Sequence, residues 1–70
     1  MTDAFDPGKW PAFMTVPEVA TVLRVSKMTV YRMIHREDMS SIRVGRSFRI
    51  PALEVERVLK EGIPVGAQEG

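Results

Sequence analysis

Two short amphipathic segments joined by a tight connection, in residues 15–36 (TVPEVATVLRVSKMTVYRMIHR), place the strongest constraint on the fold. A hydroxyl residue precedes each segment, Thr15 before the first and Ser26 before the second, and such residues are preferred helix N-caps. Glu18 follows Thr15 by three positions and completes a capping-box pattern, while Pro17 falls in the first turn, where a missing N–H costs nothing. The sequence therefore predicts helices over about 16–23 and 27–36.

The apolar residues of both segments recur at the spacing of one helix face. They are Val19, Val22 and Leu23 in the first segment and Val30, Met33 and Ile34 in the second. The other positions of the second helix should point toward solvent, namely Lys27, Met28, Thr29, Arg32 and His35, with Tyr31 near the boundary. This is the layout of a helix-turn-helix, in which the second helix enters the DNA major groove.

Residues 42–50 (IRVGRSFRI) predict a short β-hairpin with four apolar positions, Ile42, Val44, Phe48 and Ile50. A two-residue turn at 45–46 would mix apolar and polar side chains on each face. A three-residue loop at 45–47 would pair Val44 with Phe48 and place all four apolar side chains on one face. We therefore expect the three-residue loop.

That register has an electrostatic consequence for two arginines on the strands. It places Arg43 directly opposite Arg49 on the exposed face, and like charges across strands are unfavourable. Such an arrangement favours an anionic partner, although both side chains could instead splay into water.

Residues 51–61 predict a third helix that begins near Pro51, ends at Gly62 and is followed by Pro64. Its expected inner face comprises Ala52, Val55, Val58 and Leu59, flanked by Leu53; its outer face carries Glu54, Glu56, Arg57, Lys60 and Glu61. We expect an irregular arm at 1–13, a DNA-binding domain at 14–61 and a flexible tail at 62–70. Trp10 and Phe13 in the arm could pack on the domain or contact a partner.

Charge is concentrated in the middle of the chain, which has 70 residues and a net charge of +1. Residues 24–49 hold seven bases and two acids, a net +5, whereas the rest of the chain has a net −4. A basic centre between acidic ends is typical of a surface that binds phosphate.

Several function classes are disfavoured by composition. The chain has no cysteine and one histidine, His35, so disulfides, thiolate metal sites and a zinc site are not expected. No apolar run approaches a membrane span, and the acidic start MTDAFDPGKW is unlike a signal peptide. No phosphate loop, nucleophile motif or paired carboxylates appear, so we expect no enzyme and no cofactor, and a cytoplasmic, nucleoid-associated protein.

TVPEVATVLRVSKMTVYRMI followed by SIRVGRSFRIPALEVERVL resembles the small excisionase-type, MerR-like winged helix-turn-helix domains. The resemblance covers about residues 14–60 and rests on the combination of these segments. It implies a mainly α fold with a small β-hairpin: three helices and a two-stranded wing. It also implies a recognition helix in the major groove and a wing on the backbone or minor groove. The DNA-binding residues carried over by position are Ser26, Lys27, Thr29, Tyr31, Arg32, Arg43, Arg46 and Arg49.

The family includes phage excisionases, which direct an integrase toward excision, and small transcription regulators. Full MerR regulators add a long dimerisation helix and an effector domain, and since these residues contain neither, we do not expect effector sensing. The resemblance therefore implies double-stranded DNA, an integrase and neighbouring copies on DNA as partners, with a small transcription regulator as the alternative function. A protein-interaction module that uses the wing and the Trp10/Phe13 arm is a second alternative. RNA binding is disfavoured because no run of exposed stacking aromatics is present.

Overall fold

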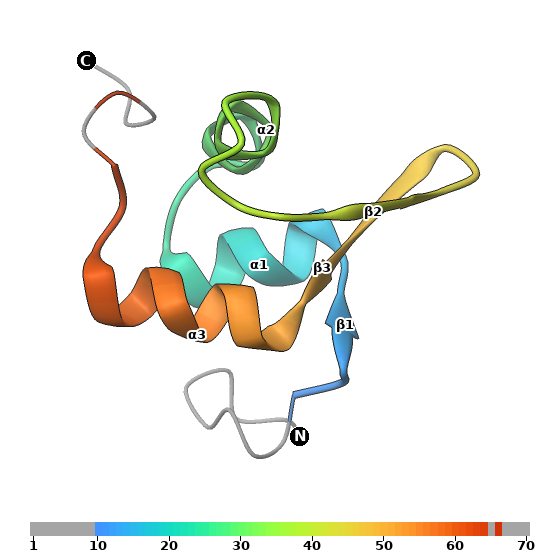
Figure 1. Cartoon of the computed structure of the whole chain (residues 1–70), viewed down its shortest axis with the longest axis horizontal. Coiled ribbons are helices and arrows are strands. Elements are labelled where there is room, and N and C mark those ends of the chain that lie inside the picture. Colours follow the sequence, from blue (N-terminus) through green and yellow to red (C-terminus); the bar gives the residue numbers. More distant parts are fainter. Residues whose placement is uncertain (1–9, 65, 67–70) are drawn as a thin grey trace.

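The computed structural model describes residues 10–64 and 66, and it contains three helices and three short strands. In chain order these are β1 (Phe13–Met14), α1 (Val16–Leu23), α2 (Lys27–His35), β2 (Ile42–Val44), β3 (Ser47–Pro51) and α3 (Ala52–Glu61). Figure 1 shows the helices gathered together and the β2–β3 hairpin projecting away from them as a wing. This arrangement confirms the predicted winged helix-turn-helix, with β1 as an additional strand.

Local hydrogen bonds explain where the first two helices begin. The Thr15 hydroxyl accepts from the Glu18 amide at 3.3 Å, and a Glu18 carboxylate oxygen accepts from the Thr15 amide at 2.8 Å. The Ser26 hydroxyl accepts from the Thr29 amide at 3.1 Å. Between the helices, Arg24 adopts a left-handed conformation (φ 59°) that ends α1 and allows the tight turn. Both predicted caps are confirmed.

The core lies where the three helices meet the base of the sheet. Its buried apolar side chains are Met14, Val16, Val19, Ala20, Val22, Leu23, Val30, Met33, Ile34, Met39, Ile50, Val55 and Val58. Trp10, Val25, Phe48, Ala52 and Ile63 pack against them from the edge. The prediction that Leu59 faces the core is wrong, because this residue is 45% exposed. The buried residues of α3 are Val55 and Val58.

The hairpin register differs from the expected one. Arg43 pairs with Phe48 and Val44 pairs with Ser47, so the turn has two residues, 45–46. Gly45 has a φ of 61°, and a glycine with positive φ at the first central position suits a two-residue turn of type II′. The predicted three-residue loop is therefore wrong.

The physical reason is that the wing extends past the helices, so its inner face needs few apolar side chains. Phe48 and Ile50 on β3 face the helices, and Met39 from the preceding loop fills space in the core. The opposite side of the sheet, here called the outer sheet face, carries Phe13, Ile42, Val44 and Arg49.

The third strand was not expected from the sequence. Phe13 pairs with Pro51 and Met14 with Ile50, which gives the strand order β1-β3-β2. Met14 is buried, whereas Phe13 remains 47% exposed on the outer sheet face. The short strand therefore fixes the base of the wing to the start of α1.

Candidate nucleic-acid interface

One side of α2 is exposed and carries polar, basic and aromatic side chains. It is formed by Lys27, Met28, Tyr31, Arg32 and His35. The opposite side, with Val30, Met33 and Ile34, is buried. Because the exposed positions follow the spacing of one helix face, their side chains project together. This is the side of a second helix that can enter a groove of DNA.

Thr29 does not lie on this exposed side. Its side chain is only 4% exposed, and its hydroxyl lies 3.1 Å from the Ser26 hydroxyl. The prediction that Thr29 points toward solvent is wrong, because the two hydroxyls form the N-cap of α2 together. Ser26 itself is exposed at the start of the helix.

An aromatic cluster joins the exposed side of α2 to the wing. The ring centre of Phe48 lies 6.0 Å from that of Tyr31 and 6.3 Å from that of His35, both in edge-to-face geometry. The guanidinium carbon of Arg43 lies 5.4 Å from the centre of the same ring. Such contacts contribute directional attraction beyond apolar burial. Phe48 thus holds a wing cation beside the residues of α2.

The expectation that Arg43 and Arg49 face each other is wrong, because the observed register places them on opposite sides of the hairpin. Arg49 pairs with Ile42, and its guanidinium donates to the Phe48 carbonyl at 3.3 Å. Its side chain therefore lies along the strand and borders the outer sheet face. Arg46 is exposed in the turn at the tip of the wing.

A hollow lies between the start of α1 and the wing. It has a volume of about 310 Å³ and is lined by Thr15, Val16, Pro17, Tyr31, Arg46, Ser47, Phe48 and Arg49. Two of its lining residues are arginines and none is acidic. Its position brings the start of α1, the exposed side of α2 and the wing to one concave surface.

The loop from α2 to the wing is attached to α3 by a polar network. Arg57 donates to the Asp38 carbonyl at 2.7 Å and to a Glu54 carboxylate oxygen at 3.1 Å. The same Glu54 oxygen accepts from the Ser40 amide at 2.9 Å. The hydrogen bond from Arg57, followed by that from Ser40, lowers the pKa of Glu54. This network fixes the loop that precedes β2 and thereby the origin of the wing.

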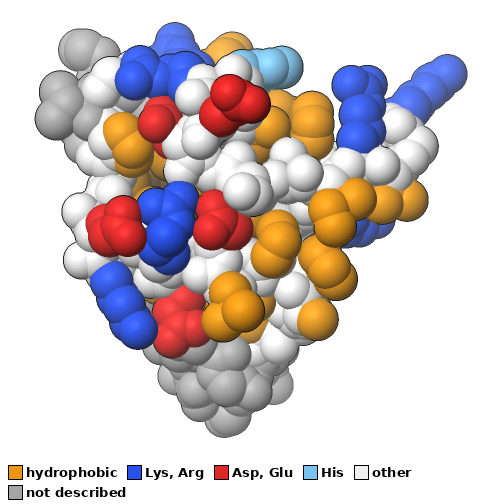
Figure 2. Space-filling view, in the orientation of Figure 1, with side chains coloured by type: hydrophobic (Ala, Val, Ile, Leu, Met, Phe, Trp, Pro, Cys, Tyr) orange, Lys and Arg blue, Asp and Glu red, His pale blue; other side chains and the backbone are white. Residues whose placement is uncertain are grey.

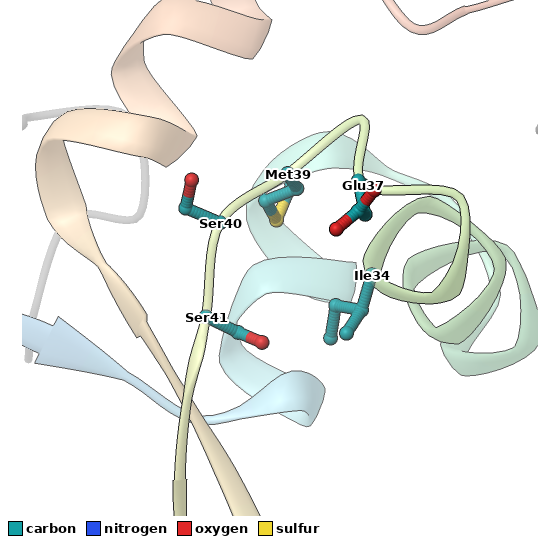
Figure 3. A pocket seen from close by; sticks show the side chains of 5 residues that line it. All are labelled: Ile34, Glu37, Met39, Ser40 and Ser41. Carbon is teal, nitrogen blue, oxygen red and sulfur yellow. The ribbon is translucent and has the colours of Figure 1, made fainter.

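A pocket beside this loop has no basic side chain in its lining, unlike the hollow between α1 and the wing. It has a volume of about 290 Å³ and is lined by Ile34, Glu37, Met39, Ser40 and Ser41 (Figure 3). Figure 3 shows the Glu37 carboxylate pointing into it from the loop that follows α2. Across residues 10–64 and 66, no three His, Cys, Asp or Glu side chains come together in the manner of a metal site.

The distribution of charge distinguishes the wing from the helices. Figure 2 shows Lys and Arg side chains on the wing, whereas acidic and basic side chains occur together near α2 and alternate in a row on α3. The acids of α3 lie close to bases of the same helix: Glu54 and Glu61 to Arg57, and Glu56 to Lys60. The charges on the surface of α3 therefore largely cancel. In the wing, by contrast, residues 42–50 contain three arginines and no acidic residue.

A family model described as a helix-turn-helix domain matches residues 13–62. The chain belongs to this helix-turn-helix domain family. The match covers all six helices and strands of the structure, so the family's domain and the folded unit coincide. None of the helices in the described part of the chain is long and apolar enough to cross a membrane.

Two relatives of the chain are proteins of Mycobacterium tuberculosis and Bacillus subtilis. "Putative DNA-binding protein Rv0500A" of Mycobacterium tuberculosis is 53% identical over 47 residues, which is 67% of this chain and 60% of that protein. An uncharacterized protein of Bacillus subtilis, YvgK, is 34% identical over 58 residues, 79% of this chain and 19% of that protein. The chain thus spans 60% of the length of the mycobacterial relative and 19% of the length of the Bacillus relative. No solved structure matches the sequence at a significant level.

Proposed function

We propose that this domain binds double-stranded DNA, with α2 in the major groove and the wing on the adjoining backbone or minor groove. The observation that carries the proposal is the aromatic cluster around Phe48. It places Arg43 of the wing next to Tyr31 and His35 on the exposed side of α2. One duplex could therefore meet Arg43 of the wing together with Lys27 and Arg32 on the exposed side of α2. The family match and the name of the mycobacterial relative support this proposal.

Each predicted contact residue has a proposed role in the complex. Lys27, Tyr31 and Arg32 contact base edges or nearby phosphates from α2. Ser26 and Thr29 fix the start of that helix through its N-cap, and Ser26, being exposed, also reaches a phosphate. Met28, which is 56% exposed on the same side, is a further candidate because apolar side chains contact the thymine methyl group.

The three wing arginines divide by position. Arg43 contacts the backbone next to α2, and Arg46 at the tip enters the minor groove, where narrow A·T-rich tracts attract arginine. Arg49 can reach a phosphate only from the edge of β3 that borders the hollow at α1. Arg46→Ala should therefore weaken binding most on duplexes with an A·T-rich flank.

A salt titration tests the proposal without knowledge of the target sequence. If about four to six phosphates are neutralised, the logarithm of the binding constant should fall against the logarithm of salt concentration with a slope of roughly −4 to −5. Fluorescence anisotropy with a labelled random duplex gives this slope. A slope near zero would refute electrostatic binding to DNA.

We further propose that the biological role is excision. The domain would bind near a phage or prophage attachment site in the cytoplasm, on the nucleoid, and direct an integrase toward excision. The sequence resemblance described above supports this role. The decisive experiment measures integrase-dependent excision with and without the protein, using Arg32→Ala as a DNA-binding variant. Excision that is equal in all three reactions would favour a small transcription regulator instead, which a promoter-fusion assay would then identify.

Organising a recombination site would require several copies on adjacent sequences. We propose that they assemble on DNA, since one small domain covers little of a duplex. Sedimentation should then show a monomer in the absence of DNA, and gel shifts should show cooperative, stepwise complexes. A stable dimer in free solution would contradict this arrangement.

A further inference from the structure

The outer sheet face presents apolar side chains that the proposed DNA interface does not use. Phe13, Ile42 and Val44 are 47%, 49% and 57% exposed. Together with Arg49 they line a shallow hollow of about 240 Å³. Figure 2 shows hydrophobic side chains running along the wing. Three neighbouring apolar side chains that are each about half exposed on a small domain favour a protein contact.

The register determines that this surface and the DNA interface are separate. Arg43 and Phe48 share the inner face of the hairpin, which is turned toward α2. Ile42 and Val44 alternate with Arg43 along β2, so their side chains point to the other side. A duplex held by α2 and Arg43 would therefore leave the outer sheet face accessible.

We propose that the outer sheet face binds a segment of another protein in which apolar side chains are flanked by carboxylates. The apolar groups of the partner would cover Ile42 and Val44. Its carboxylates would meet Arg49, which borders the hollow. The strands β2 and β3 contain arginines and no acidic residue, so the charge at this surface is of one sign.

A second copy of this domain fits the surface less well. Pairing two outer sheet faces would bring Arg49 of one copy against Arg49 of the other. The acidic helix α3 is the other candidate, but its Glu54, Glu56 and Glu61 already lie within 3.8 Å of Arg57 or Lys60. No carboxylate of that helix is without a basic partner to offer to Arg49. With the acids of α3 paired and the outer sheet face basic, charge complementarity favours a different protein.

Three short synthetic peptides test the proposal on the free protein, so that the result does not depend on DNA binding. The first alternates leucine with glutamate, the second replaces glutamate with lysine, and the third replaces leucine with serine. Fluorescence anisotropy at physiological salt should show that the leucine–glutamate peptide binds about 10-fold tighter than either control. Amide chemical-shift changes should centre on Phe13, Ile42, Val44 and Arg49.

Two variants and one control locate the binding. Ile42→Ser with Val44→Ser should weaken the leucine–glutamate peptide by about 10-fold, and Arg49→Gln should remove the preference for glutamate over lysine. Leu59→Ser, a change at an exposed leucine of α3, should leave binding unchanged. Because all four substituted side chains are at the surface, circular dichroism should show that the variants are folded. If the double variant unfolds, Arg49→Gln alone still tests the preference for an acidic peptide.

Other outcomes would overturn the proposal. Equal affinity for all three peptides would exclude a specific apolar and acidic partner. Shift changes centred on Lys27, Arg32 and Arg43 would show the peptide acting as a polyanion on the DNA interface. Self-association that Ile42→Ser abolishes in sedimentation would assign the surface to a second copy. A salt titration on DNA with the wild type and with the Ile42→Ser, Val44→Ser double variant shows separately whether the proposed function stands.

Discussion

Arg43 lies over the ring of Phe48, with its guanidinium carbon 5.4 Å from the ring centre. The two residues are also direct cross-strand partners in the hairpin. Since the same ring lies in edge-to-face geometry with Tyr31 and His35, the position of Arg43 depends on α2. The aromatic ring thus couples the wing to α2.

Removing the Phe48 ring should loosen the wing and destabilise the domain. Phe→Ala in a full core costs about 3–5 kcal/mol, and because Phe48 is only partly buried we expect about 2 kcal/mol for Phe48→Ala. Urea unfolding measures this loss. Val44→Ala, on the exposed outer face of the same hairpin, should change stability by less than about 0.5 kcal/mol. Equal effects of the two changes would contradict the observed register.

The two strand arginines should contribute differently to DNA binding. Arg43 lies on the side of the wing next to α2, so Arg43→Ala should reduce the salt-dependence slope by about 1. Arg49→Ala should reduce it less, because the side chain lies along the edge of β3 and donates to the Phe48 carbonyl. Salt titrations of both variants on one duplex provide the comparison. A larger loss for Arg49→Ala would place the duplex on the other side of the wing.

Arg32 should determine sequence preference. It is exposed on α2, and a good bidentate contact to a base discriminates by about 1–3 kcal/mol. Arg32→Ala should therefore lower affinity for a selected site more than affinity for random duplex. Lys60→Ala on α3 is the control and should alter neither affinity. If Arg32→Ala weakens both duplexes equally, its contact is to phosphate.

The network around Glu54 should make stability depend on pH in the acidic range. The hydrogen bond from Arg57 lowers the pKa of Glu54 below its usual value of 4.5, so the folded state favours the ionised carboxylate. Its contribution is fully present above pH 4.5 and is lost as the pH falls through the lowered value. Melting curves of wild type and Glu54→Gln should differ at pH 7 and converge in strong acid. A constant difference between them at every pH would exclude this linkage.

The N-cap of α2 should matter for stability even though Ser26 is exposed. Loss of a serine cap costs about 1 kcal/mol, so Ser26→Ala should lower the melting temperature. Ser47→Ala, an exposed serine beside the wing turn, is the matched control and should be silent. Should Ser26→Ala melt like the wild type, the cap hydrogen bond contributes nothing measurable.

The elements could be predicted from the sequence because their causes are local. Thr15 with Glu18 and Ser26 with Thr29 cap helices through contacts three residues apart, and Gly62 ends α3 as expected. Helical spacing also predicted the buried side of α2, except at Thr29, whose hydroxyl is drawn into the cap. The candidate recognition helix was therefore apparent before any tertiary contact was known.

The arrangement of the wing depended on contacts that are distant in the sequence. Residues 42–50 allow two registers, and burial of all four apolar side chains would favour the wrong one. In the folded protein Met39 and Ile50 fill the core, Met14 adds a strand beside β3, and Phe48 meets Tyr31 and His35. Ile42 and Val44 then have no interior to enter. Sequence by itself determined the helices and the basic centre, whereas packing between distant residues decided which side of the hairpin each arginine occupies.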